Sequence, residues 1–205
     1  MIHVFFVRHA QPVSEWAEDR TRPLTEEGSR DAREVTRFFA NRTIDAFYSS
    51  PYRRSYETIS ESAALAGREI ITDERLRERQ KGVNGNNQEM FRKRWADHDY
   101  HEEGGESLSM VRERNVAALR DILVANERED RDMNIVIGTH ATALSSILSH
   151  FDPDFGHDSF LRILNWMPYI IEVVFDRGSP VAHKEHFFIE KEYTGKYSGG
   201  KPGSR

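Results

Sequence analysis

The 205-residue chain contains 38% hydrophobic and 31% charged residues and carries a formal net charge of −5. This balance is typical of a soluble globular protein, and it argues against a general nucleic-acid-binding surface while allowing a local basic pocket. Cysteine is absent, which excludes disulfides, thiolate catalysis and cysteine-ligated zinc. The apolar stretches are too short for a signal peptide or a membrane span, so we expect a cytoplasmic protein with no membrane partner.

Strands and helices alternate along the first part of the chain. Residues 2–7 predict a buried strand, and a helix with Thr25 as its N-cap follows and runs to about residue 40. Residues 44–48 predict a short strand. The next helix begins near Arg53 and ends at Gly67, a residue type that is common just after a helix.

The same alternation continues to the end of the chain. The predicted segments are a weak strand at 69–72, a polar lid or insertion at 80–105 with a short helix near 89–96, a helix at 107–125, a strand at 133–138 followed by a helix, and two strands at 169–175 and 181–188 that are antiparallel. The pattern predicts an α/β fold: a three-layer α/β/α arrangement with a mostly parallel central sheet and one antiparallel edge region. We expect residues 1–193 to form a single domain and 194–205 to form a mobile tail.

Polar side chains that could bind a ligand or take part in catalysis follow four successive predicted strands. In a parallel sheet the carboxyl ends of the strands share one edge, and ligands bind there in open α/β folds. We therefore expect these side chains to meet in one site. They are Arg8 and His9 after the first strand, Arg53 and Arg54 after the second, Glu78 after the third, and Thr139 and His140 after the fourth.

These residue types are the ones that phosphate chemistry needs. Guanidinium groups form paired, charge-assisted hydrogen bonds with a phosphate dianion. A neutral imidazole can attack phosphorus, and a second, protonated imidazole would stabilise the charge on the equatorial oxygens. A carboxylic acid can protonate the leaving alcohol and later accept a proton from water. Singly, each residue is more often a surface ion pair, so their coincidence in four successive loops favours the phosphate site.

Six short motifs, in order between residues 4 and 148, resemble those of the histidine phosphatase superfamily, which has the phosphoglycerate-mutase-like fold. The motifs are Arg8-His9-Ala10, Leu24-Thr25 with Gly28, the segment from Ser49 to Thr58, Leu76-Arg77-Glu78 with Gly82, Gly105-Glu106-Ser107, and Gly138-Thr139-His140-Ala141.

The resemblance implies roles for individual residues. It makes His9 the phospho-accepting nucleophile and Glu78 the proton donor. It makes Arg8 and Arg54 phosphate-binding residues, and His140 the residue that completes the phosphate pocket. It also selects Arg54 over the neighbouring Arg53, a choice that the residues alone leave open. No metal or other cofactor is implied, because arginines and histidines supply the positive charge.

Departures from the family pattern concern the choice of substrate. Ala141 replaces the usual glycine after the second histidine, and Asn84-Gly85 stands where the family has Trp-Glu-Gly. The span 82–105 is shorter than the insertion of the mutases, so hydrolysis is favoured over transfer. Substrate recognition is expected in 80–105, where Arg92 to Arg94 could bind a second anionic group or form a solvated helix face.

The sequence therefore predicts a metal-independent phosphomonoesterase that uses a covalent phosphohistidine on a small phosphorylated metabolite or phosphoprotein. Three alternatives stay open: a phosphoglycerate-mutase-type phosphotransferase, a non-catalytic phosphate-binding regulatory module, and a metal-dependent hydrolase. The last would use ligands among His98, His101, Glu102, His150 and His157, although their spacing matches no established metal motif. The oligomeric state is left open.

Overall fold

The computed structural model describes residues 1–191. The tail predicted at 194–205 lies outside the described residues. The elements, in chain order, are β1 (Ile2–Arg8), α1 (Glu26–Phe39), β2 (Ala46–Ser49), α2 (Arg53–Leu65), β3 (Ile70–Thr72), a 3-10 turn (Glu74–Leu76), α3 (Gln88–Ala96), α4 (Leu108–Asn126), β4 (Met133–Thr139), α5 (Ala141–Phe151), α6 (His157–Leu164), β5 (Trp166–Asp176) and β6 (Ser179–Glu190).

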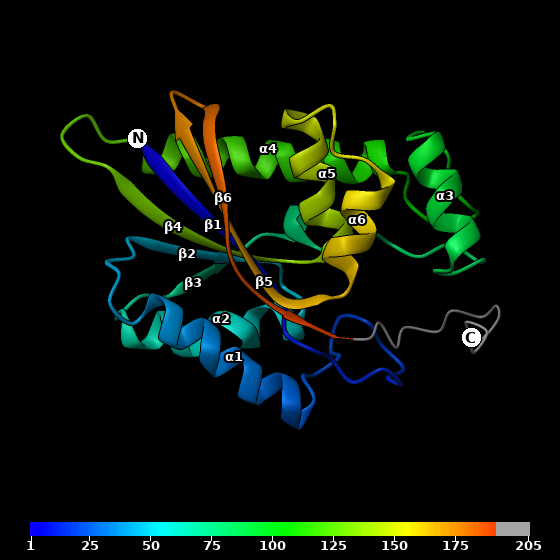
Figure 1. Ribbon diagram of the computed structural model, residues 1–205, viewed down its shortest axis with the longest axis horizontal. Coiled ribbons are helices and arrows are strands. Elements are labelled where there is room, and N and C mark those ends of the chain that lie inside the picture. The colour runs from blue at the N-terminus through cyan, green and yellow to red at the C-terminus, as the bar shows by residue number, and fades with distance from the viewer. Residues whose placement is uncertain (192–205) are drawn as a thin grey trace.

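The six strands form one sheet in the order β3-β2-β4-β1-β5-β6. The first four strands are mutually parallel, whereas β5 runs antiparallel to β1 and β6 antiparallel to β5. In Figure 1, α1 and α2 lie on one side of the sheet and α4, α5 and α6 on the other. The predicted three-layer α/β/α class with an antiparallel edge is therefore confirmed.

The layer of α1 and α2 is held by aromatic packing. Val35 and Phe39 of α1 are buried against Phe5 of β1 and Phe47 of β2. Phe5 and Phe39 meet edge to face with ring centroids 5.6 Å apart. These side chains recur at helical spacing in α1 and alternate along the strands, which is why the sequence predicts both elements.

The start of α1 is fixed by its cap and by a close backbone contact. The Thr25 hydroxyl accepts a hydrogen bond from Gly28 N at 2.8 Å, as the predicted N-cap requires. Gly28 also lies against the segment that follows β1, since a Cβ at this position would be 2.1 Å from the carbonyl oxygen of Gln11. No larger residue fits here without moving the backbone.

The opposite layer holds the larger core, and it contains a helix that the sequence analysis missed. Leu119 of α4 and Leu144 of α5 are fully buried together with Phe6 and Ile137 of the sheet. The missed helix is α6, whose inward face carries apolar side chains three and four residues apart. These side chains are Phe160, Ile163 and Leu164.

The antiparallel edge of the sheet is a hairpin. Arg177 and Gly178 connect β5 to β6 with φ angles of 47° and 79°. Positive φ at both central residues is typical of a type I′ turn, whose twist matches that of the flanking strands. The predicted antiparallel pairing of the last two strands is confirmed.

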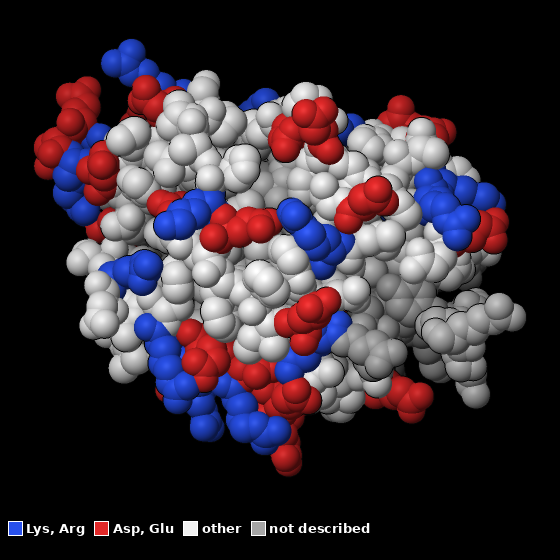
Figure 2. Space-filling view, viewed as in Figure 1, with Lys and Arg blue, Asp and Glu red and all other residues white. Residues whose placement is uncertain are grey.

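Charges of both signs are interspersed on one face of the molecule. Figure 2 shows acidic and basic side chains alternating over the face it displays, with no extended area of one sign. A face of this kind does not attract polyanions over a broad area. Within residues 1–191, no helix is long and apolar enough to cross a membrane.

Candidate active site

The carboxyl ends of the parallel strands meet around a cavity of about 520 Å³. His9 follows β1 directly, and its backbone N donates to the carbonyl of Thr139 at the end of β4, at 3.1 Å. Arg8, His9, Arg54 and Glu78 all line the cavity. The structure thus brings together residues that are as far apart in the sequence as 8 and 78.

His9 presents one ring nitrogen to this cavity. Its Nδ1 donates a hydrogen bond to the carbonyl of Ala10 at 2.8 Å, so the lone pair belongs to Nε2. The Nε2 atom lies 3.2 Å from Nε of Arg54. Burial and the neighbouring charges of Arg54 and Arg8 hold the pKa of His9 well below its ordinary value. The imidazole is therefore neutral, which is the state a nucleophile requires.

Arg54 and its neighbour Arg53 point to different environments. The Arg54 side chain is buried in the first turn of α2, and its Nη1 donates to the carbonyl of Asp19 at 2.7 Å. The Arg53 side chain is 53% exposed and pairs with Glu57 at 2.7 Å. Of the two arginines between which the residues alone did not decide, only Arg54 lines the cavity.

Arg8 is anchored by two carbonyls, one from the missed helix and one from the first residue of β5. Its Nη1 donates to the carbonyl of Ile163 in α6 and to that of Trp166, the latter at 2.8 Å. The guanidinium is almost fully buried at the cavity wall. Helix α6 therefore contributes to the site without supplying a reactive group.

His140 lies behind His9, not in the cavity lining. The two rings are 5.2 Å apart, and a 2.7 Å hydrogen bond links Nε2 of His140 to Oγ of Ser50. Burial and the charge of Arg54 hold the pKa of His140 well below its ordinary value. These surroundings favour a neutral imidazole, whereas the sequence argument assumed a protonated one. A phosphate dianion beside it would act in the opposite direction.

Glu78 reaches the cavity wall at the beginning of α5. Its Oε1 accepts hydrogen bonds from the backbone N–H groups of Arg79 and Ala143, at 2.8 and 3.1 Å, and its Oε2 accepts one from Thr142 at 3.1 Å. Helix N-termini carry unsatisfied N–H groups that hold carboxylates well. The carboxyl group is thereby fixed in position beside the cavity.

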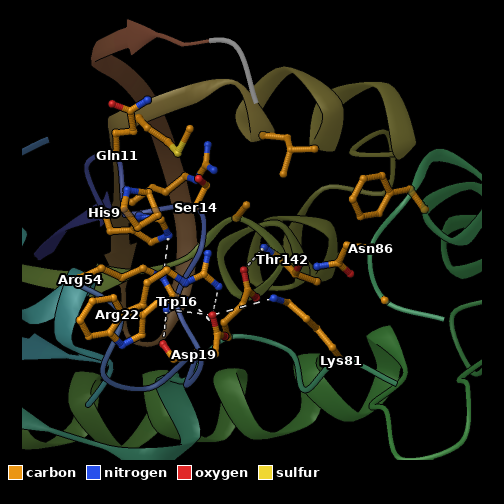
Figure 3. A pocket seen from close by; sticks show the side chains of 18 of the residues that line it. His9, Gln11, Ser14, Trp16, Asp19, Arg22, Arg54, Lys81, Asn86 and Thr142 are labelled. Carbon is orange, nitrogen blue, oxygen red and sulfur yellow. Dashed lines mark hydrogen bonds and ion pairs between the residues drawn. The ribbon is translucent and has the colours of Figure 1, made fainter. Parts of the chain in front are cut away.

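Sequence reasoning missed the loop residues that complete this cavity. The carboxylate of Asp19 pairs with Arg22 and lies 3.3 Å from Arg54 and 4.0 Å from Lys81, contacts that Figure 3 draws. Burial and the charges of Arg22 and Arg54 lower the pKa of Lys81. The only signal in the sequence was the density of charges in 15–22. Other missed lining residues are Gln11, Ser14, Trp16, Asn86 and Thr142.

Two interpretations of the 80–105 region are not supported. Arg92, Lys93 and Arg94 are absent from the cavity lining, and Lys93 instead pairs with Glu89 at 2.8 Å. The carboxylate of Glu102, named as a possible metal ligand, is buried in an ion pair with Arg94. Among residues 1–191, no group of three histidine or acidic side chains could hold a metal ion.

Comparison with known families decides the classification. A family model described as the histidine phosphatase superfamily (branch 1) matches residues 4–184. The chain belongs to this superfamily. A relative named phosphoserine phosphatase 1, from Hydrogenobacter thermophilus, is 26% identical over 162 residues, which cover 72% of this chain and 74% of that protein. Another relative from the same organism is 38% identical over 84 residues, a stretch that spans 40% of that relative's length.

Solved structures share the fold at lower identity. A phosphoserine phosphatase from Entamoeba histolytica, in complex with 3-phosphoglyceric acid, has a TM-score of 0.71 at 19% identity, covering 94% of this chain and 99% of its own. A mycobacterial glucosyl-3-phosphoglycerate phosphatase has a TM-score of 0.69 at 15% identity, covering 93% and 99%. The family model assigns the chain to the histidine phosphatases, and the solved structures show that it shares their fold.

Proposed function

We propose that this phosphatase hydrolyses phosphomonoesters of small metabolites through a covalent phosphohistidine at His9. The observation that carries the proposal is the state of this imidazole: Nδ1 donates to a backbone carbonyl, and the low pKa leaves Nε2 unprotonated beside two buried arginines. The Nε2 lone pair accepts a hydrogen bond from Nε of Arg54. When Arg54 binds the phosphoryl oxygens instead, the lone pair is available to attack an electrophile that arrives with negative charge.

In the first step, Nε2 of His9 attacks phosphorus and the bond from phosphorus to the ester oxygen breaks. The carboxyl group of Glu78 gives its proton to the departing oxygen, so the product leaves as a neutral alcohol. Arg8 and Arg54 bind the phosphoryl oxygens. The phosphate dianion raises the pKa of His140, so that its ring can take up a proton and stabilise the same oxygens. The Nδ1–H group keeps donating its hydrogen bond to the carbonyl of Ala10, which stabilises the phosphorylated ring.

In the second step, a water molecule attacks phosphorus and the bond from phosphorus to Nε2 breaks. The Glu78 carboxylate takes a proton from this water, which restores the acid for the next cycle. Inorganic phosphate leaves and His9 returns to its neutral form. In both steps, guanidinium and imidazole groups provide the positive charge.

The cavity supports a small substrate. Its volume of about 520 Å³ lies within the range of small-molecule sites and could not enclose a folded protein domain. Two relatives are named as phosphatases of phosphoserine and of glucosyl-3-phosphoglycerate. Each of these compounds carries a carboxylate in the same small molecule as its phosphate. A phosphomonoester of a small carboxylic acid is accordingly the first substrate class to test.

The test follows the phosphoryl group directly. The wild type is incubated with ³²P-labelled phosphoserine and with p-nitrophenyl phosphate in the presence of a chelator, and both phosphate release and acid-labile protein label are measured. We expect turnover and a labelled enzyme, and we expect the His9→Ala variant to lose both, with kcat reduced by about 10³-fold or more.

A second histidine provides the matched control. His183 is exposed on β6, away from the cavity, so His183→Ala should keep both turnover and label. Turnover that survives in His9→Ala would overturn the covalent route. Binding of phosphate without turnover of either substrate would instead favour the regulatory module considered from the sequence.

A further inference from the structure

Asn86 faces the cavity from a loop, and its orientation is determined by its partners. Its side-chain Oδ1 lies 3.0 Å from Nη2 of Arg79 and 3.1 Å from Nη1 of Arg94. A guanidinium can only donate hydrogen bonds, so the atom between these two groups must be the amide oxygen. The NH₂ group consequently points the other way, and Figure 3 shows the nitrogen of Asn86 turned toward the cavity.

The two arginines that hold Asn86 are themselves fixed. Arg79 and Arg94 are 3% and 2% exposed, and between them lies the carboxylate of Glu102, which is 4% exposed. This carboxylate pairs with Arg94 and lies 3.7 Å from Nη1 of Arg79. Arg94 also donates to the carbonyl of Gly85 at 2.7 Å. The amide of Asn86 is therefore held by a buried network and has little freedom to rotate.

The backbone around this network is closely packed. A Cβ on Gly82 would lie 2.7 Å from Cβ of Glu102, and one on Gly105 would lie 2.8 Å from the backbone N of Gly82. The backbone at the two ends of the 80–105 segment is therefore in close contact. The Asn86 amide is presented by a rigid support, which is what a selective hydrogen-bond donor needs.

A second donor accompanies this amide in the cavity. The ammonium group of Lys81 also lines it, and Figure 3 draws Lys81 and Asn86 on the side of the cavity away from His9. The acidic groups that face this region are Glu78, bound to the N-terminus of α5, and Asp19, which lies 4.0 Å from Lys81 and pairs with Arg22. Neither accepts a hydrogen bond from the Asn86 amide in the described part of the chain.

We propose that Asn86 is a specificity-determining residue whose oriented NH₂ group, together with Lys81, recognises a carboxylate on the leaving-group portion of the substrate. The inference rests on the proposed phosphatase function of the same cavity. The phosphoryl group would meet His9 and the departing oxygen would meet Glu78. The far end of the leaving group then reaches the NH₂ group of Asn86 and the ammonium group of Lys81, while the carboxylates of Glu78 and Asp19 are already paired with other groups. An oxygen acceptor is therefore favoured there.

The sharpest test is Asn86→Asp. This change keeps an oxygen between Arg79 and Arg94 and replaces the cavity-facing NH₂ group with a second oxygen, so a donor becomes an acceptor at constant shape. The substrates are phosphoserine and phosphoethanolamine, which differ by the carboxylate, and p-nitrophenyl phosphate as the reference. We expect the wild type to favour phosphoserine over phosphoethanolamine at least tenfold in kcat/KM.

In the variant we expect that preference to fall at least tenfold, mainly through a higher KM for phosphoserine, while kcat/KM for p-nitrophenyl phosphate changes less than threefold. The melting temperature should hold or rise, because the new carboxylate faces two guanidiniums. The matched control is Asn87→Asp, where the side chain caps α3 and does not line the cavity. Aspartate caps as well as asparagine, so this variant should keep the wild-type preference.

The outcomes separate the two proposals. A wild type that turns over p-nitrophenyl phosphate through His9 but shows no preference for phosphoserine would overturn the role of Asn86. An equal loss on all three substrates in Asn86→Asp would also overturn it, since a general defect is not a change of selectivity. Failure of the wild type on every substrate would count against the phosphatase proposal itself.

Discussion

The cavity has two walls that are built by different means. The strand wall consists of Arg8, His9 and Arg54, and backbone carbonyls hold the first two, as at Ala10, Ile163 and Trp166. The loop wall consists of Asp19, Arg22, Glu78, Lys81 and Asn86, and the segments that carry it are tied by ion pairs of Asp19, Glu102 and Glu106. Carbonyls do not titrate, whereas carboxylates do, so acid should disturb the loop wall before the strand wall.

The largest effect should come from breaking the strand wall at Arg54. Arg54→Gln removes a buried guanidinium next to His9, and kcat/KM should fall by about 10²- to 10³-fold. Because burial and Arg54 together lower the pKa of His9, the pKa of His9 should be higher in the variant than in the wild type. The neutral nucleophile is then lost at a higher pH, and the acid limb of the kcat/KM profile should move upward in pH.

The neighbouring arginine is the control for this change. Arg53→Gln removes the same group from an exposed pair with Glu57, so activity should change less than twofold. Similar losses of activity in the two variants would mean that Arg54 has no special role in the cavity, and would contradict its assignment to the strand wall.

The loop wall can be tested by acid through Glu106. Burial would raise the pKa of this carboxyl, but hydrogen bonds from Arg77, Arg114 and the backbone of Gln80 outweigh it and lower the pKa to about 2, from an ordinary 4.5. A lowered folded-state pKa contributes stability above pH 4.5, which is lost as the pH falls toward 2. The contribution is about 3 kcal/mol at most.

Glu106→Gln should therefore lower the free energy of unfolding at pH 7 and flatten its decline between pH 4.5 and 2, as measured by urea titration. Glu89→Gln, which breaks the exposed pair with Lys93, is the control and should leave the same curve unchanged. A wild-type curve that is flat over this range would show that the ion pairs of Glu106 add nothing to stability.

A smaller effect is expected where the two walls meet, at Asp19. Its carboxylate faces Arg54 and Lys81, so it competes with a phosphate for the same cations. Asp19→Asn retains the backbone carbonyl that binds Arg54, and the inhibition constant of inorganic phosphate should fall about three- to tenfold. Asp158→Asn, at a fully exposed site, is the control. Weaker inhibition by phosphate in Asp19→Asn would mean that Asp19 chiefly orients Arg54.

The strand wall could be predicted from the sequence because a parallel sheet does most of the positioning. Once 2–7 and 133–138 are read as neighbouring buried strands, their carboxyl ends must lie together, and so must His9 and His140. Register fixes these positions to within one residue, since β1 and β4 pair from Ile2 with Met133 to Arg8 with Thr139.

The loop wall could not be predicted in the same way. Asp19, Lys81 and Asn86 are placed by side-chain contacts between segments that show no periodicity, and a charge in a loop is usually solvated. Helix α6 could have been predicted, since Phe160, Ile163 and Leu164 recur at helical spacing. Its contact with the site could not. Only the structure shows that the carbonyl of Ile163 in this helix binds Arg8.

The contact between Gly28 and the carbonyl of Gln11 has a consequence for directed evolution of this enzyme. It fixes the start of α1 against the segment that follows His9, so we expect His9 to keep its position when residues farther along the loop change. A library that randomises positions 19, 81 and 86 while keeping glycine at 28 would then sample new leaving groups while the position of His9 stays the same. Variants that lose Gly28 would be eliminated whatever their pocket recognises.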